Sequence, residues 1–87
     1  MKFLTTATSK PNRFSIGVVQ PLGQFFLSIP VSNRLVDYIE YYAIDEPTYK
    51  MIEADLTLGT SIADRCRRRE MDEQLILKPG SDRGFPS

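Results

Sequence analysis

Residues 13–30 read RFSIGVVQPLGQFFLSIP, and this stretch decides the fold. Apolar side chains alternate with polar or small ones on both sides of a turn signal, which is the spacing typical of half-buried strands. The stretch therefore predicts an antiparallel hairpin with one apolar face. The residues expected on that face are Phe14, Ile16, Val18, Phe25, Leu27 and Ile29.

The segments around this hairpin predict the rest of the sheet. Pro21 and Gly23 favour a tight turn between the two strands, because proline presets the first corner and glycine tolerates a strained exit. The threonine-rich residues 2–7 predict an edge strand. The apolar run at residues 75–77, closed by Pro79 and Gly80, predicts a last strand that returns to the sheet.

Residues 33–43 fit a helix better than a strand. A strand would place Asp37 on one face with Leu35 and Ile39, and would bury its charge there. Ser32 or Asn33 can cap a helix at this point. The apolar side chains then recur at helical spacing, at Leu35, Val36, Ile39, Tyr42 and Ala43. We expect a helix here, with a strand over residues 41–44 as the alternative because tyrosine and isoleucine favour sheets.

Two further helices are predicted after residue 44. Asp45 can cap the first, and Pro47 suits its first turn, so a helix to about Ala54 is expected with Tyr49 and Ile52 inward. Asp55 can cap the next helix, whose inward residues are expected to be Leu58, Ile62, Ala63 and Cys66.

These segments add up to an α+β fold. It has a small antiparallel sheet built on the N-terminal hairpin, two or three helices and one C-terminal strand. With 87 residues we expect a single domain, residues 1–87, whose last residues 81–87 form a flexible, exposed tail.

The composition excludes several classes of function. The chain has no histidine and one cysteine, Cys66, so catalysis by Ser-His-Asp or Cys-His groups and a zinc site of Cys and His are excluded. The glycines form no phosphate-binding loop. No apolar run approaches the roughly 20 residues that cross a bilayer, and one cysteine excludes an intramolecular disulfide. We expect a cytoplasmic protein that has no cofactor, binds no metal and is not an enzyme.

The charges cancel overall but are unevenly distributed. Residues 35–55 carry six acids and one lysine, although the whole chain has 11 basic and 11 acidic residues. Such a block is either a solvated face or a surface that docks a basic partner, and the neighbouring tyrosines favour docking because tyrosine is enriched at interfaces. The arginine-rich residues 65–69 favour helix termination and salt bridges over nucleic-acid binding, because acids follow directly.

A set of short motifs also spreads along residues 24–86. They are Gln24–Pro30, Tyr41–Asp45, Tyr49, Cys66-Arg67, Arg69-Glu70, Asp72, Leu75-Ile76, Lys78–Gly80 and Arg83-Gly84. Together they resemble small bacterial immunity proteins of contact-dependent growth inhibition systems. The resemblance implies a cytosolic protein that binds the C-terminal domain of a cognate toxin, commonly a nuclease, in a 1:1 complex and blocks its active site.

Under this resemblance the partner-binding residues lie in the acidic block. They are Asp37, Glu40, Tyr41, Tyr42, Asp45, Glu46 and Glu53. The acids would mimic a phosphate substrate and the tyrosines would supply contact area, while Asp45 is partly engaged as a helix cap. Neither a small-molecule substrate nor a membrane is expected as a partner. The alternatives are a small phage or mobile-element inhibitor of a host protein and a nucleic-acid-binding protein that uses residues 65–69.

Overall fold

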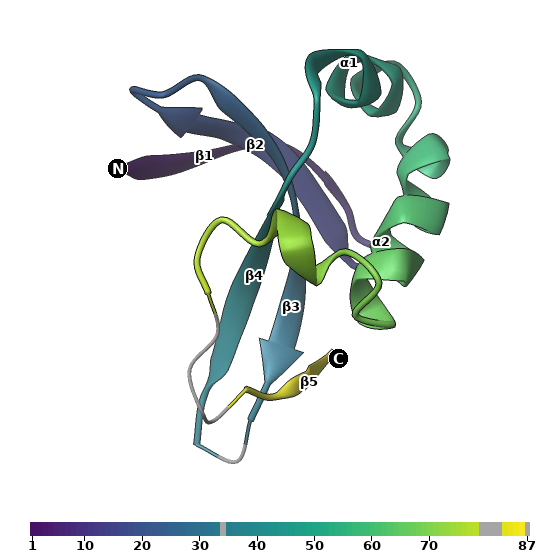
Figure 1. The fold of residues 1–87 in the computed structure, drawn as a ribbon. Coiled ribbons are helices and arrows are strands. Elements are labelled where there is room, and N and C mark those ends of the chain that lie inside the picture. Colours follow the sequence, from purple (N-terminus) through teal and green to yellow (C-terminus); the bar gives the residue numbers. More distant parts are fainter. Residues whose placement is uncertain (34, 79–82, 87) are drawn as a thin grey trace.

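The computed structural model describes residues 1–33, 35–78 and 83–86. Four antiparallel strands follow one another in the sheet in chain order (Figure 1). They are β1 (Lys2–Ser9), β2 (Phe14–Gln20), β3 (Gln24–Ser32) and β4 (Asp37–Ala43). A short strand, β5 (Phe85–Pro86), pairs with Val31 and Ser32 of β3, beyond the point where β2 stops pairing. The predicted hairpin, the edge strand and the α+β class are confirmed.

The register of the sheet places the predicted apolar residues on one face. Ile16 of β2 lies opposite Leu27 of β3, and Leu27 lies opposite Tyr42 of β4. All three are fully buried. We call this surface the core face, because α1 and α2 pack against it (Figure 1).

The helical half of the chain follows β4. It comprises α1 (Glu46–Ala54), the 3₁₀ turn η1 (Leu56–Gly59), α2 (Thr60–Arg67) and the 3₁₀ turn η2 (Asp72–Gln74). The Asp45 carboxylate accepts a hydrogen bond of 2.9 Å from the backbone N–H of Thr48, so it caps α1 as its position predicts. Tyr49 and Ile52 are buried, which confirms the expected inner face of α1.

The prediction of a helix over residues 33–43 is wrong. Residues 37–43 form β4, with Tyr38, Glu40 and Tyr42 on the core face. The objection to a strand was a buried charge at Asp37, but Asp37 lies at the exposed end of β4. The acid on the core face is Glu40, whose charge is met by an arginine from the far end of the chain.

Two smaller expectations about buried residues and strands also need correction. Leu58 is 46% exposed because it lies in η1 and not on the inner face of α2. Residues 75–77 do return to the sheet, but Leu75 forms only an isolated bridge to Tyr42, and the N–H of Ile76 donates to the carbonyl of Tyr41. The C-terminal strand is β5 instead.

Part of the expected tail lies against the sheet. The side chain of Arg83 is only 15% exposed, Gly84 is buried, and Phe85 and Pro86 form β5. The expectation of an exposed tail is therefore wrong for Arg83 and Gly84, because ion pairs and strand pairing hold this segment. The rest of the predicted tail, residues 81, 82 and 87, lies outside the described residues.

The opposite face of the sheet carries an aromatic cluster. The ring centroids of Phe3 and Tyr41 are 4.0 Å apart, and Phe26 meets Tyr41 edge-on at 5.0 Å. β1 and β4 are separated by two strands, so the sheet twists enough to bring Phe3 and Tyr41 together. Phe26 is fully buried beneath them.

A hydrogen bond between side chains joins the edge strand to the first helix. The Thr6 and Tyr49 hydroxyl oxygens are 2.6 Å apart. We expect Tyr49→Phe to lower the free energy of unfolding by about 1 kcal/mol, because it removes this bond and the longer one of 3.4 Å to Glu53 but keeps the ring. Tyr41→Phe, whose hydroxyl has no hydrogen bond within the described part of the chain, is the matched control. Equal urea midpoints for the two variants would contradict the expectation.

Among the described residues, no helix is long and apolar enough to cross a membrane.

Candidate functional site

The predicted partner-binding residues do not form one surface. Glu40 is 5% exposed and Tyr42 is fully buried, so neither can contact a partner in this structure. Tyr41 is half-buried in the aromatic cluster. Asp37 lies at the start of β4, and Ala43 lies at its end, next to α1. The two positions are six residues apart, which is about 20 Å along a strand.

The remaining predicted acids lie on or beside α1. Asp45 and Glu46 are exposed at its start, whereas Glu53 is exposed near its end and accepts a long hydrogen bond of 3.4 Å from Tyr49. Of the predicted set, Asp45 and Glu46 are neighbours along the chain and remain exposed, whereas Glu40 and Tyr42 contact each other inside the protein.

Glu40 belongs to a buried ion pair. Its carboxylate accepts hydrogen bonds of 2.9 and 3.1 Å from the guanidinium of Arg83 and one of 2.7 Å from the hydroxyl of Tyr42. Arg83 also donates to both carboxylate oxygens of Asp72, at 2.6 and 2.8 Å. This cluster ties β4, η2 and the C-terminal segment together. It gives Glu40 a structural role, since a buried carboxylate needs such partners.

The ionisation of the cluster follows from these contacts. Hydrogen bonds from Arg83 lower the pKa of Asp72, and the carboxylates of Asp72 and Glu40 raise the pKa of Arg83. Burial raises the pKa of the Tyr42 hydroxyl, and its hydrogen bond to Glu40 raises it further. Asp72 and Arg83 are therefore charged at neutral pH, and Tyr42 keeps its proton.

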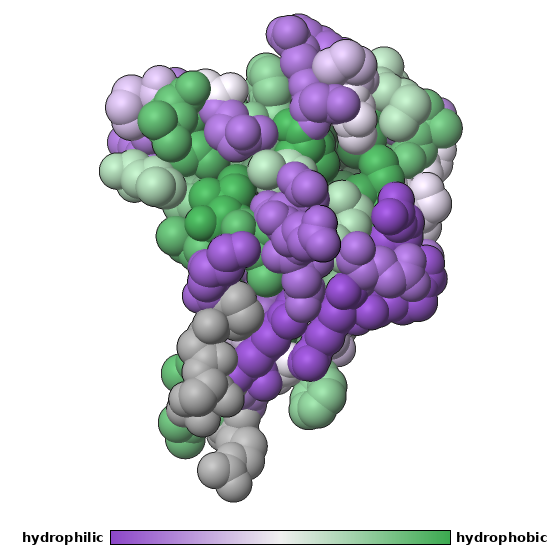
Figure 2. Space-filling view, viewed as in Figure 1, coloured by the Kyte–Doolittle hydropathy of each residue, from purple (hydrophilic) through white to green (hydrophobic). Residues whose placement is uncertain are grey.

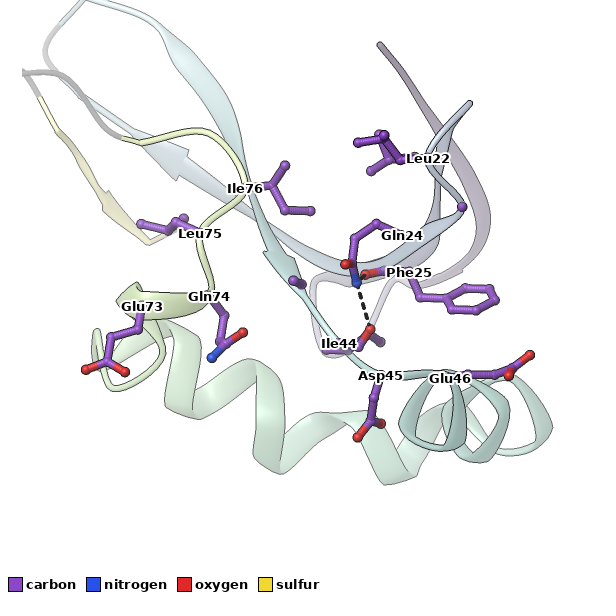
Figure 3. Close-up of a pocket in the computed structure, with 13 residues that line it drawn as sticks. Leu22, Gln24, Phe25, Ile44, Asp45, Glu46, Glu73, Gln74, Leu75 and Ile76 are labelled. Atoms are coloured by element: carbon purple, nitrogen blue, oxygen red, sulfur yellow. Dashed lines mark hydrogen bonds between the residues drawn. The ribbon is translucent and has the colours of Figure 1, made fainter.

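A groove of about 590 Å³ lies between the β2–β3 turn and the segment after η2 (Figure 3). Leu22 and Ile76 face each other from its two sides, with Gln24 between them. The side-chain amide of Gln24 donates to the carbonyls of Phe25 and Ile44 at 2.9 and 3.0 Å, and these bonds fix the position of Gln24 in the groove. The lining of the groove thus combines apolar side chains with the polar side chain of Gln24.

The rim of the groove is acidic. Asp45, Glu46 and Glu73 are among its lining residues, and in Figure 3 their carboxylates point away from the groove in three different directions; no lysine or arginine is among its lining residues. Hydrogen bonds from Thr48 lower the pKa of Asp45, which keeps that carboxylate charged. Apolar side chains next to polar and charged ones are common in protein-binding surfaces.

The sequence did not predict Glu73 as a member of this site. Its neighbour Asp72 pairs with Arg83, whereas Glu73 is exposed and has no ion pair within the described residues. The segment that carries Glu73 meets the sheet through Leu75 and Ile76. The apolar run at residues 75–77 is the one signal in the sequence that pointed to this return.

Exposed hydrophobic residues lie beside the groove and also elsewhere on the surface. Figure 2 shows hydrophobic residues on the side that carries the β2–β3 turn and the segment after η2, with hydrophilic residues below and beside them. Leu22 is 71% exposed and Leu77 is 52% exposed.

The arginines at residues 65–69 form ion pairs or hydrogen bonds with other residues of the same chain. Arg65 and Arg68 pair with Glu70 at 3.6 and 2.7 Å, and Arg67 pairs with Asp64 at 2.8 Å. Arg69 donates to the carbonyl of Gly84 at 3.0 Å. The salt bridges predicted for this cluster are confirmed.

Cys66 is a buried packing residue of α2. Burial raises the pKa of its thiol from 9.0 to about 12. Cys66 and Tyr42 therefore both hold their protons more tightly in the folded chain than in the unfolded one. The stability that they contribute is complete below about pH 9 and is lost as the pH rises toward about 12.

We expect the melting temperature to fall steadily above about pH 9, for this reason. Thermal melts followed by circular dichroism across the alkaline range measure it. Cys66→Ala removes one of the two groups and should make the fall less steep. A melting temperature that stays constant up to about pH 11 would contradict this assignment.

Among the described residues, no group of three or more Cys, Asp or Glu side chains is placed to hold a metal ion. No protein-family model, no curated protein and no solved structure matches this chain.

Proposed function

We propose that this protein is a non-enzymatic immunity protein that binds a cationic toxin domain in the acidic-rimmed groove and blocks it. The observation that carries the proposal is the groove itself, whose lining includes Asp45, Glu46 and Glu73 and no basic residue. The resemblance to immunity proteins of contact-dependent growth inhibition supplies the biological setting, which is the bacterial cytoplasm.

The chemistry of a nuclease toxin fits such a groove. A nuclease presents lysines and arginines to the phosphates of its substrate, and carboxylates can occupy the same positions. The space between Leu22 and Ile76 would take an aliphatic or aromatic side chain of the toxin and exclude water around it. The acids at the rim would accelerate association and reject acidic partners.

Co-expression with the product of the adjacent gene tests the proposal. We expect that gene to encode the C-terminal end of a very large secreted protein, and the two chains to purify as a tight 1:1 complex. The toxin domain should lose its toxicity when this protein is present. Absence of binding at micromolar concentrations would reject the proposal.

Reversing the charge of the groove rim should slow association with the toxin domain. We expect Glu46→Lys combined with Glu73→Lys to reduce the association rate about 10-fold to 100-fold at low salt, because both long-range attractions become repulsions. Stopped-flow fluorescence at several salt concentrations measures the rate.

A second double variant separates the groove from the general acidity of the chain. Asp37→Lys with Glu53→Lys makes the same change of charge outside the groove, and it should slow association much less. Equal losses in the two double variants would show that the net charge, and not the groove, drives association.

A further inference from the structure

A second hollow adjoins the groove. It has a volume of about 540 Å³, and its lining reaches from the end of β4 across the start of α1 to α2. The two hollows share part of their lining, so they form one continuous depression, which we call the track. The residues that line both are Gln24, Ala43, Ile44, Asp45 and Gln74.

The two ends of the track carry apolar side chains. In the groove, Leu22 and Ile76 face each other from opposite sides (Figure 3). In the second hollow, Ile62 of α2 and Met71 are half-buried and pack against the core. Each end can therefore remove an apolar side chain of a partner from water.

The middle of the track carries hydrogen-bond acceptors. Both N–H groups of the Gln24 amide donate to backbone carbonyls, which leaves its oxygen as an acceptor, and this oxygen has no hydrogen-bond partner within the described residues. The carboxylate of Asp45 accepts from the N–H of Thr48 and has lone pairs left for another donor. The middle thus lacks a donor that a partner can supply.

The charge of the track favours a cation. Glu46 and Glu73 line the groove, and Asp45 lines both hollows. Among the described residues that line the track, Arg65 is the only base, and its guanidinium lies 3.6 Å from the carboxylate of Glu70. The donor that complements the middle of the track is therefore a positively charged one.

An arginine in an extended segment meets these conditions. Its planar guanidinium has five N–H donors, so one side chain can serve more than one acceptor. In an extended chain, alternate side chains point to the same side. An arginine with an apolar residue two positions before it and another two positions after it therefore presents all three side chains to one surface.

We propose that the track binds such a segment of the toxin domain. Its arginine donates to Gln24 and Asp45, and its two apolar side chains lie in the groove and in the second hollow. Only the identity of the partner chain rests on the proposed function, because the apolar ends and the acceptors belong to this protein.

Nuclear magnetic resonance titration of the full chain tests the track with three synthetic peptides. The first is acetyl-Leu-Ser-Arg-Ser-Leu-amide, the second has glutamine in place of arginine, and the third has alanine in place of both leucines. We expect saturable shifts at Ile62 as well as Ile76 with the first peptide. The other two should bind about tenfold more weakly, because one loses the charged donor and the other the apolar contacts. Equal affinities of the three peptides, or no shift at Ile62, would overturn the proposal.

Asp45→Asn separates binding from helix capping. Asparagine caps a helix about as well as aspartate, so the melting temperature of the free protein should stay nearly the same. The affinity for the arginine peptide should fall about tenfold, since the charge of the acceptor is lost. Asp55→Asn makes the same change at the cap of η1, outside both hollows, and should leave the affinity unchanged. Equal effects of the two variants would contradict the role of Asp45.

Arg65→Ala should tighten binding of the arginine peptide about two- to fivefold, because it removes the one like charge that lines the track. Arg68→Ala removes the other arginine that pairs with Glu70 and should have no effect. If the toxin domain forms a complex that Asp45→Asn does not weaken, the track proposal fails and the proposed function stands. If the arginine peptide binds the track but the toxin domain does not bind, the proposed function fails and the track stands.

Discussion

Arg83→Met should lower the free energy of unfolding by about 3–5 kcal/mol. Methionine keeps much of the apolar stem of arginine but removes the charge that faces Glu40, whose side chain is only 5% exposed. Breaking a buried pair is costly because the remaining carboxylate must stay ionised without its partner or take up a proton. The C-terminal segment would also lose its two bonds to Asp72.

Urea denaturation followed by circular dichroism measures this loss. The control is Arg68→Met, which removes an exposed pair with Glu70 and should cost far less stability. Adding Glu40→Gln to Arg83→Met should recover much of the lost stability, because the orphaned charge is then gone. A loss below about 1 kcal/mol for Arg83→Met alone would mean that the pair is not buried in solution.

Gly17→Ala should cost about 3 kcal/mol, at the upper end of the range for overpacking. A Cβ at this position would overlap the carbonyl oxygen of Leu4 on β1 and lie 2.6 Å from Cζ of Phe26. The carbonyl is backbone and cannot rotate away, so β1 must move off β2 or the ring of Phe26 must leave its place. Either change disrupts the aromatic cluster with Phe3 and Tyr41.

Gly23→Ala is the matched glycine control. Gly23 has a φ of 75° in the β2–β3 turn, and a Cβ added there would have no neighbouring atom within 4 Å. Alanine at this position therefore meets only backbone strain of about 1 kcal/mol. Chemical denaturation measures the free energy of unfolding of both variants. The difference between them separates the cost of a steric clash at Gly17 from the cost of backbone strain at Gly23. Equal losses would contradict the close approach of β1 to Gly17.

Local signals were enough for about half of the fold. The alternation in residues 13–30, the turn at Pro21 and Gly23, and the cap at Asp45 act over a few residues each, and all of them operate in the structure as expected. Binary patterning and capping depend on neighbouring residues along the chain, so one sequence suffices to read them. The same reasoning failed for β4, where the helical spacing of apolar residues competed with strand pairing.

The failure at β4 has a definite physical cause. A strand there places Glu40 on the core face, which is acceptable only if a cation reaches it. Arg83 supplies that cation from beyond η2, and the pairing with β3 supplies the backbone partners. Arg83 and β3 are both distant from Glu40 along the chain, so the local periodicity of the sequence contains no information about them.

The features of the candidate site also divide into those that the sequence predicts and those that arise only in the folded chain. The sequence alone determined that the middle of the chain is acidic, that it has no histidine, and that Asp45 begins a helix beside Glu46. Only the tertiary structure decided that Glu40 and Tyr42 are buried and that Glu73 is among the lining residues of the groove. Composition and capping are properties of single residues and their neighbours, whereas burial and the meeting of distant side chains arise only when the sheet, the helices and the C-terminal segment pack together.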